Sequence, residues 1–438
     1  MSDPTPAGPG RPLPQASRPL GPPPFDLTGG HFALSLIAFG IGSLLLPFAA
    51  PDLALGNPFA PRTLALVHLF ALGMLGSAVT GALHQFYPMA LGVPIRSVRI
   101  GRLGLTAWTL GLVALISGLW SWTPALMGLG WLGIVASVGC VSWNLLPARR
   151  RTQVPDGKRI GAYVTAGHSA LGIVLVIAAL RIGSDFGWWG GDRLSLLAVH
   201  FHMGVFGFGT LTAIGVGSRM LPMFLLTGPS PSRPLKLIGP ALVAGLLVQG
   251  AGILGGWAPV TLLGSGILLA AALVTSLLLV RWWTGRHRPL EGGLELLPAA
   301  TLWLLVSAGL GSALLLSTQR NFRLWEAYAA VALLGWLIHL VLAVLLRIVP
   351  HLSYLHLFGR RGGAPVPLEQ VVQRGWARGA AVVLPSGLLV LVLGILAGSE
   401  RVALAGGILW AVGALTALAV FVRMLVLAYS PRLEVARQ

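Results

Sequence analysis

The sequence contains about twelve apolar runs, each long enough to cross a lipid bilayer as one helix. Only 10% of its 438 residues are charged, whereas a soluble domain carries about 25%. Because hydrocarbon offers the backbone no hydrogen bonds, such runs must be helical, and we expect an all-α polytopic membrane protein. The predicted runs are 31–50, 63–87, 101–121, 123–146, 161–182, 194–225, 235–255, 258–282, 296–317, 325–357, 379–398 and 402–428.

The chain before the first run has a different composition. Residues 1–30 hold nine proline residues and end in two glycines, so we expect a disordered tail followed by one membrane domain over 31–438. The one cysteine, Cys140, excludes a disulfide within the chain and a cysteine-based zinc or iron–sulfur site.

Basic residues gather in alternate loops, which predicts the orientation of the helices. By the positive-inside rule the richer set and both termini are cytoplasmic, in the cell's inner (cytoplasmic) membrane, and the runs 63–87, 194–225 and 325–357 pass from outside to inside. The net charge of +18 then reflects topology and contact with anionic lipid rather than nucleic-acid binding. The richer set is Arg96, Arg99, Arg102, Arg149, Arg150, Arg151, Lys158, Arg159, Arg233, Lys236, Arg281, Arg286, Arg288, Arg360, Arg361, Arg374 and Arg378, and the opposite set is Arg62, Arg181, Arg193, Arg320, Arg323 and Arg401.

Three of the runs resemble one another in their prolines. Pro88, Pro222 and Pro350 recur at spacings of 134 and 128 residues, which is the length of one four-helix unit. His68 and His202 each precede their proline by 20 residues. We therefore predict a threefold internal repeat of four helices, arranged as three pseudo-symmetric arcs.

Two histidines lie close together near the start of run 194–225. His200 and His202 point about 200° apart on one helix, so they look out of opposite sides of it. A buried imidazole in hydrocarbon needs a hydrogen bond or a metal, so this pair predicts a metal or haem site. His68 lies at a similar depth in run 63–87, and His68 with either His202 or His200 could hold a flat macrocycle between two facing helices.

A second group of polar residues lies toward the predicted cytoplasmic end. We expect His84 and His351, with Arg219 and Arg347, to form an inner site in which the arginines meet haem propionates, an anionic substrate or lipid headgroups. Snorkelling of both arginines to the membrane surface is the alternative interpretation. His339 is expected near the middle of the bilayer.

The segments His68–Pro88 and His200–Pro222 resemble the catalytic subunit of haem–copper oxidases and nitric-oxide reductases, and the related NnrS-type haem membrane proteins. The resemblance lies in the twelve helices, the three arcs and the sequence Ala198-Val-His200-Phe-His202. It implies a haem b-binding protein of nitric-oxide- or oxygen-linked redox chemistry or electron transfer, and thus a haem-dependent oxidoreductase with an electron donor.

The resemblance also implies roles for individual residues. His68 and His202 correspond to the ligands of a low-spin haem, and His200 to the proximal ligand of a second haem, so one or two haems b are expected. Copper lacks such support, because the sequence has no His-Pro-Glu-Val-Tyr and no adjacent His-His pair for a three-histidine copper site. Lys158 and Lys236 both lie in loops, so proton pumping through a lysine channel is not expected.

Two other functions fit the same residues. A transporter of haem, metal or a small anion could use the outer and inner groups as stations joined by His339. A structural membrane subunit would keep all ten histidines as ordinary core residues. The absorption spectrum of the purified protein would distinguish a haem protein from a transporter or a structural subunit.

Overall fold

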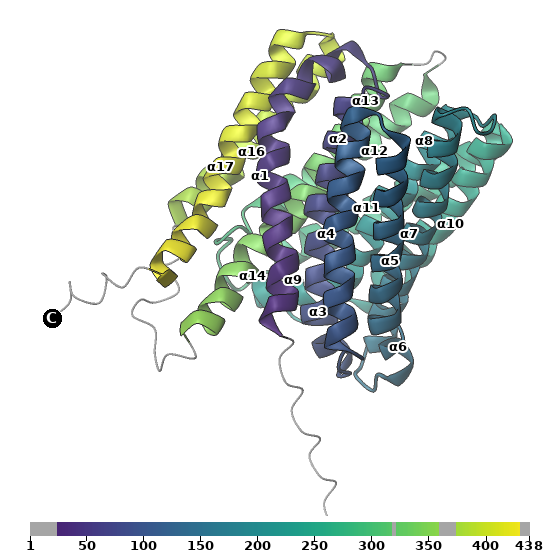
Figure 1. Ribbon diagram of the computed structural model, residues 1–438. Coiled ribbons are helices and arrows are strands. Elements are labelled where there is room, and N and C mark those ends of the chain that lie inside the picture. The colour runs from purple at the N-terminus through teal and green to yellow at the C-terminus, as the bar shows by residue number, and fades with distance from the viewer. Residues whose placement is uncertain (1–23, 318–320, 359–373, 430–438) are drawn as a thin grey trace, which may run out of the picture.

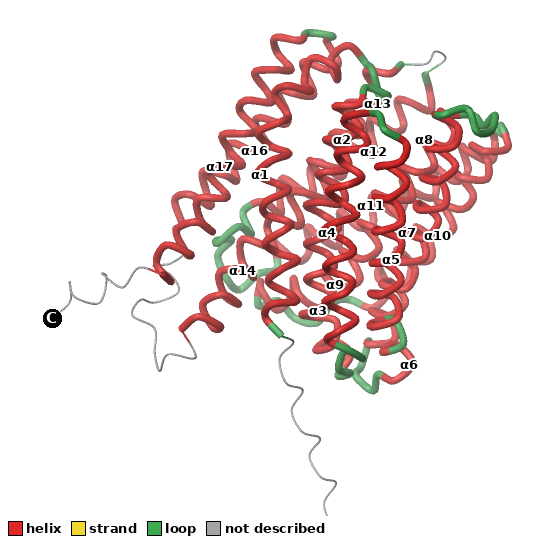
Figure 2. Tube along the Cα trace, in the orientation of Figure 1, coloured by secondary structure: helices red, strands yellow, loops and turns green. Residues whose placement is uncertain are grey.

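The protein is a bundle of long helices that lie side by side (Figure 1). The computed structural model describes residues 24–317, 321–358 and 374–429. Within these ranges every regular element is a helix, coloured red in Figure 2, and no strand occurs, which confirms the predicted all-α class. In the described part of the chain, twelve helices, three of them interrupted, are long and apolar enough to cross a membrane, so the protein is a multi-pass membrane protein.

The twelve spans follow one another with short links. In order they are α1 (Phe25–Leu55); α2 (Pro61–His68), η1 (Leu69–Gly76) and α3 (Ser77–Leu91); α4 (Val98–Ser121); α5 (Pro124–Leu145) with the short α6 (Ala148–Arg151); α7 (Gly157–Asp185); α8 (Arg193–His202), η2 (Met203–Thr210) and α9 (Leu211–Leu225); α10 (Ser232–Gly255); α11 (Ala258–Thr284); α12 (Leu296–Leu316); α13 (Phe322–Ala330), η3 (Val331–Ile338) and α14 (His339–Phe358); α16 (Arg374–Ala397); and α17 (Glu400–Tyr429). The elements labelled η are π-helical.

The first helix begins earlier than the sequence indicates. Because α1 starts at Phe25, the assignment of residues 25–30 to a disordered tail is wrong. Gly30 faces α4 there, where a Cβ atom would lie 2.7 Å from Leu105 Cδ2, so this glycine permits close helix packing instead of ending the helix. Residues 1–23 of the predicted tail, and Arg320, Arg360 and Arg361 of the charged loops, lie outside the described residues.

The predicted repeat is confirmed by the interruptions in three helices. Each of the second, sixth and tenth spans contains an eight-residue π-helical segment, and the segments begin at Leu69, Met203 and Val331. These starts recur at the spacings of the three prolines, since 203 − 69 is 134 and 331 − 203 is 128. Gly92 and Leu226 end the first two of these helices in the same left-handed conformation. The helices that carry the histidines are therefore three copies of one structure.

Three helical hairpins, α4–α5, α10–α11 and α16–α17, repeat a second pattern. At Gly130, Gly264 and Gly406 an added Cβ atom would overlap the backbone of the neighbouring helix, so only glycine permits this approach. The triplets that share this pattern are Gly111, Gly245 and Gly387; Gly118, Gly252 and Gly394; and Gly130, Gly264 and Gly406. Each four-helix unit thus closes through the same tight hairpin.

The three interrupted helices form the centre of the bundle. In the most apolar 18-residue stretch of these three spans, 78%, 56% and 83% of the residues are buried. In the other described spans this share is 50% or less. The π-helical segments contact one another, and Trp336 of η3 donates a hydrogen bond of 2.9 Å to Thr210 of η2. A cavity of about 70 Å³, which we call the axis cavity, lies between the α-helices that follow these segments, and repeat-equivalent residues such as Ala78 of α3, Thr212 of α9 and Leu340 of α14 line it. A pseudo-threefold axis therefore runs along the bundle.

The outside of the bundle is apolar. Large hydrophobic side chains, such as Phe48 at 69% and Leu277 at 70% exposed, project from many of the helices. Such a surface is unstable in water and stable in hydrocarbon. Figure 1 shows that α1 begins and α17 ends toward the same end of the bundle, where α3 and α14 lie.

Candidate functional site

The best-defined polar site pairs the second and sixth spans. The rings of His68 and His200 have centroids 6.0 Å apart and planes at 43°. His68 is the last residue of α2, directly before η1, and its Nδ1 donates a 2.7 Å hydrogen bond to Leu64 O. That bond leaves the Nε2 lone pair of His68 available, while the buried Nδ1 of His200 has no hydrogen-bond partner. These two imidazoles can therefore accept a ligand between them.

The pair lines a cavity of about 190 Å³, which we call the first cavity. Leucine, valine and other apolar side chains form most of its wall. Gly204 lies on this wall, and a Cβ atom there would meet only Val174 at 3.9 Å, so open space adjoins the glycine. The cavity is smaller than the roughly 300–1,000 Å³ of small-molecule sites, so a large ring enters only if lining side chains rotate.

Charged residues close the first cavity at its predicted outer end. Asp185 forms ion pairs with Arg181 at 3.0 Å and with Arg193 at 2.6 Å. Both guanidinium groups also lie over the ring of Phe59, at 5.3 and 5.1 Å from its centroid. The cavity wall includes Arg181 and Asp185 themselves. One end of the apolar space thus carries an ion pair of Arg181 and Asp185, and Arg193 binds the same carboxylate from outside the wall.

His202 faces a different compartment, as the predicted 200° separation from His200 requires. Its Nδ1 donates to Ala198 O at 2.7 Å, and its Nε2 accepts a hydrogen bond from the Tyr328 hydroxyl at 3.1 Å. It lines a second cavity of about 230 Å³ together with Trp325. Both nitrogens of His202 are therefore satisfied within the protein, whereas Nδ1 of His200 has no hydrogen-bond partner. The ring that faces His68 is His200, whereas the resemblance implies His202.

The repeat explains why Tyr328 meets His202. Subtracting the 128-residue spacing places Tyr328 at the position of His200, so the contact between His202 and Tyr328 copies that between His68 and His200. Sequence reasoning missed Tyr328, although this spacing identifies it. At the third junction the equivalent residues are Ala330 and Leu66, which carry no polar side chain.

In the third four-helix unit, a tryptophan occupies the position that corresponds to the first and second cavities. Ile134 lines the first cavity and Leu268 the second, and Trp410 is their equivalent in the third unit. The fully buried Trp410 donates to Ser43 Oγ at 3.0 Å. Its ring also packs against His339 at 5.6 Å between centroids. His339 is therefore part of this filled compartment and joins neither predicted site.

The predicted inner site does not form as one group, which corrects the expectation. His84 stacks on His31, which sequence reasoning left outside the predicted sites, with centroids 5.6 Å apart. His351 and Arg347 instead line a separate cavity of about 850 Å³, while Arg219 is exposed. His84 directly precedes Gln85, which is the repeat equivalent of Arg219 and Arg347, so its side chain points about 100° away from that position on the helix.

The His31–His84 pair is itself short of partners. His84 Nδ1 donates to Thr80 O at 2.9 Å, but His84 Nε2 and both nitrogens of His31 are buried without hydrogen bonds. Gly81 allows this contact, since a Cβ atom there would lie 3.0 Å from the Cβ of His31. Among the described residues no group of three or more histidine, cysteine, aspartate or glutamate residues could hold a metal ion.

The distance between His68 and His200 fits a metal between them. Metal–imidazole bonds are about 2.0–2.1 Å long, which places the ring centroids of two opposed ligands ~6 Å apart. The observed 6.0 Å is close to this value, and it is also an ordinary distance between packed rings. The donor set, two imidazole nitrogens beside an apolar space, is of the kind that ligates haem iron, and Arg181 at one end of this space is already paired with Asp185.

Comparison with known proteins does not assign the chain to a family. No protein-family model matches the chain, and no curated protein sequence matches it either. The function must therefore be derived from the side chains and cavities themselves.

Proposed function

We propose that the protein is a haem b-binding membrane protein in which His68 and His200 hold the iron in the first cavity. The observation that carries the proposal is the pair of neighbouring imidazoles with centroids 6.0 Å apart, in which the hydrogen bond of His68 Nδ1 leaves Nε2 as the acceptor nitrogen and His200 Nδ1 has no hydrogen-bond partner. A haem bound there supplies reversible one-electron oxidation and reduction. The role we assign is electron transfer linked to nitric-oxide or oxygen chemistry.

The protein's own residues would do three things at this site. The hydrogen bond to Leu64 O fixes the tautomer and ring orientation of His68, which keeps its Nε2 turned away from the backbone. Arg181 and Arg193 offer positive charge to carboxylates at the predicted outer end. The apolar wall excludes water from the imidazole pair, which sets the environment in which the iron changes charge.

The presence of two imidazoles favours electron transfer over direct reaction with a gas. If His68 and His200 both held a haem, its chemistry at this site would be the gain and loss of one electron. Gas chemistry would need a second centre, and the second cavity with His202 is the available compartment. A haem there would have to displace the Tyr328 hydroxyl from His202 Nε2.

The orientation in the membrane belongs to the same proposal. We place the arginine-rich loops and both termini on the cytoplasmic side of the inner membrane, which puts the His68–His200 pair toward the outside. An electron donor would then approach from that side, near Arg181.

Transport is the weaker alternative for this geometry. The axis cavity is lined mainly by alanine, valine and leucine, which offer no polar route along the centre of the bundle. His339, the proposed middle station, is fully buried against Trp410. Uptake of haem, metal or an anion into proteoliposomes by a protein without a redox spectrum would support transport instead.

The proposal is tested by the absorption spectrum of the purified protein. We expect a Soret band that shifts reversibly on reduction, and close to one haem b per chain by the pyridine haemochrome assay. His68→Ala and His200→Ala should abolish or shift the band, whereas His287→Ala, in an exposed loop, should leave it unchanged. A colourless protein that takes up no haem on reconstitution refutes the proposal.

A further inference from the structure

A second pair of imidazoles lies between α1 and α3. The rings of His31 and His84 have centroids 5.6 Å apart and planes within 12° of parallel. Both residues are fully buried, with 0% of either exposed. Unlike His68 and His200, they line none of the cavities described above. A ligand that joins these two rings must therefore be small, which excludes a macrocycle such as haem.

Three of the four nitrogens in this pair lack a hydrogen-bond partner. His84 Nδ1 donates to Thr80 O, so the lone pair of His84 lies on its orphaned Nε2, and both nitrogens of His31 are orphaned as well. A neutral imidazole carries one N–H group and one lone pair, so each residue can offer one lone pair to a ligand. Burial of such groups without partners is unfavourable in an apolar interior. The distance between the rings is an ordinary one for packed side chains, so it is these nitrogens that point to a ligand.

The surroundings of the pair supply no compensating negative charge. In the described part of the chain, the ionisable groups that act electrostatically on the two rings are other imidazoles: His84 acts on His31, and His168 of α7 acts on His84. His168 Nδ1 donates to Val164 O at 3.0 Å, and its ring packs against Phe208. An ion bound by the pair is therefore held by neutral nitrogen alone.

This donor set discriminates between metal ions. Zinc takes three or four protein ligands, and calcium and magnesium take oxygen, whereas the pair offers two nitrogens. A divalent ion would also carry two uncompensated charges into an apolar interior, and the cost of burying an ion rises with the square of its charge. Cu(I) is monovalent, binds imidazole and forms stable complexes with two ligands. The pair therefore favours Cu(I) over the common divalent ions.

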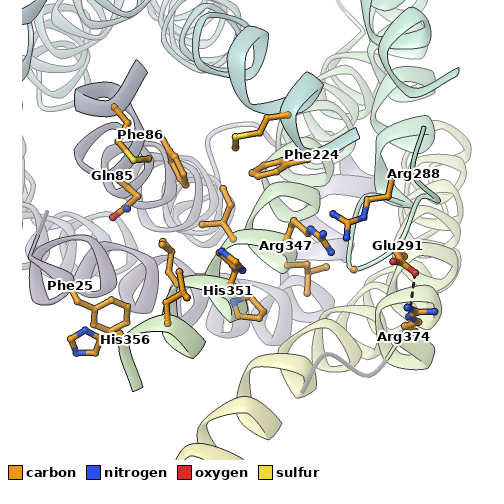
Figure 3. Close-up of a pocket in the computed structure, with 18 of the residues that line it drawn as sticks. Phe25, Gln85, Phe86, Phe224, Arg288, Glu291, Arg347, His351, His356 and Arg374 are labelled. Atoms are coloured by element: carbon orange, nitrogen blue, oxygen red, sulfur yellow. Dashed lines mark ion pairs between the residues drawn. The ribbon is translucent and has the colours of Figure 1, made fainter. Parts of the chain in front are cut away.

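The pair lies behind the wall of the cavity of about 850 Å³ at the predicted cytoplasmic end. Gln85, the residue after His84, lines this cavity, as Figure 3 shows. Because neighbouring residues on a helix point about 100° apart, His84 is turned away from the cavity and shielded from it. Met89 and Met223 also line the cavity, and their thioether groups are soft ligands that bind Cu(I). Copper that reaches this cavity is thus one residue away from the buried pair.

We propose that His31 and His84 bind one Cu(I) ion between α1 and α3. The ion takes Nε2 of His84 and one nitrogen of His31, while the other nitrogen of His31 keeps its proton. Two of the three orphaned nitrogens are then satisfied, and the ion joins the first span to the second. The proposal does not rest on haem binding at His68 and His200.

The test measures copper retained by the full-length protein in detergent. The protein is stripped of metal, incubated without oxygen in chelator-buffered Cu(I), desalted and analysed by inductively coupled plasma mass spectrometry. We expect close to one copper per chain, and much less zinc after the same treatment with Zn(II). His31→Gln and His84→Gln should each lower the retained copper about tenfold or more, since each removes one of two ligands. Cu(I) should also raise the unfolding midpoint of the unsubstituted protein but not that of His84→Gln.

A matched control is available in another buried histidine. His339 Nδ1 donates to Leu334 O and its Nε2 is buried without a partner, but its ring lies against Trp410 instead of a second imidazole. His339→Gln should therefore leave the copper content unchanged. His200→Ala removes a ring of the other imidazole pair and should also keep the copper, so loss of haem and loss of copper are separate results.

Four outcomes would overturn the proposal. Copper no higher in the unsubstituted protein than in His84→Gln would mean that the pair holds only water. An equal loss in His339→Gln, or sulfur ligands in the X-ray absorption spectrum of the bound copper, would place the ion elsewhere. One zinc per chain would refute the choice of ion. If His31→Gln fails to fold, the copper content of His84→Gln and the two-nitrogen X-ray absorption spectrum decide in its place.

Discussion

The ion-paired carboxylate at the predicted outer end offers the sharpest test of the structure. Asp185→Asn keeps the shape of the side chain but removes the charge shared by Arg181 and Arg193. The side chains of Asp185 and Arg181 are each only 10% exposed, so the substitution leaves Arg181 as an uncompensated, largely buried cation. Loss of one partner from a buried pair costs about 3–5 kcal/mol.

Two features of the site reduce that cost. Arg181 also donates to the Arg193 carbonyl oxygen at 3.2 Å and lies over Phe59, and both contacts survive the substitution. Arg193 is 45% exposed, so its pair with Asp185 adds only about 0–1 kcal/mol. We therefore expect Asp185→Asn to lower the free energy of unfolding by about 2–3 kcal/mol.

The assay is reversible unfolding in mixed micelles as the fraction of dodecyl sulfate rises, followed by circular dichroism. Asp156→Asn is the matched control, since Asp156 pairs with Arg159 at 2.7 Å but is 57% exposed, and it should change stability by about 0–1 kcal/mol. Adding Arg181→Met to Asp185→Asn should restore part of the loss, because it removes the stranded charge. Equal effects of the two aspartate substitutions would refute the reasoning.

Further predictions concern the second cavity, the hairpins and the topology. Tyr328→Phe removes the hydroxyl that satisfies His202 and should cost about 1–3 kcal/mol of unfolding free energy in the same assay, with no change in a haem spectrum that arises from the first cavity. Gly264→Ala should destabilise by about 1–3 kcal/mol through overlap with the neighbouring helix, whereas Gly266→Ala, which has nothing within 4 Å, should be neutral or stabilising; a reversed order would contradict the hairpin packing. A cysteine placed at Arg150, in a chain without the native cysteine, should react with a membrane-impermeant maleimide only after the cells are opened, and labelling of intact cells would reverse the assigned orientation.

The membrane fold could be predicted from the sequence because its physical causes are local. Apolar length sets each span, and the recurrence of Pro88, Pro222 and Pro350 indicates the repeat. The predicted start of the first helix was wrong because a Gly-Gly pair in isolation is typical of a helix end. Only the contact of Gly30 with α4 shows that this glycine permits close packing.

The candidate site was predicted less completely, since it depends on how helices rotate about their axes. Depth along the helix identified His68 and His200, but it could not decide between His200 and His202 as the partner. The π-helical segment between His68 and His84 changes the helical phase, so extrapolation at 100° per residue fails beyond it. His84 therefore meets His31, a contact that spacing alone could not predict.

Trp410 has a consequence for stoichiometry. Its indole occupies the place that Ile134 and Leu268 leave open in the other two units. Under the proposed function, the first and second cavities could each take a ring-shaped ligand once lining side chains rotate, whereas Trp410 closes the equivalent position in the third unit. A substitution such as Trp410→Ala would open that position.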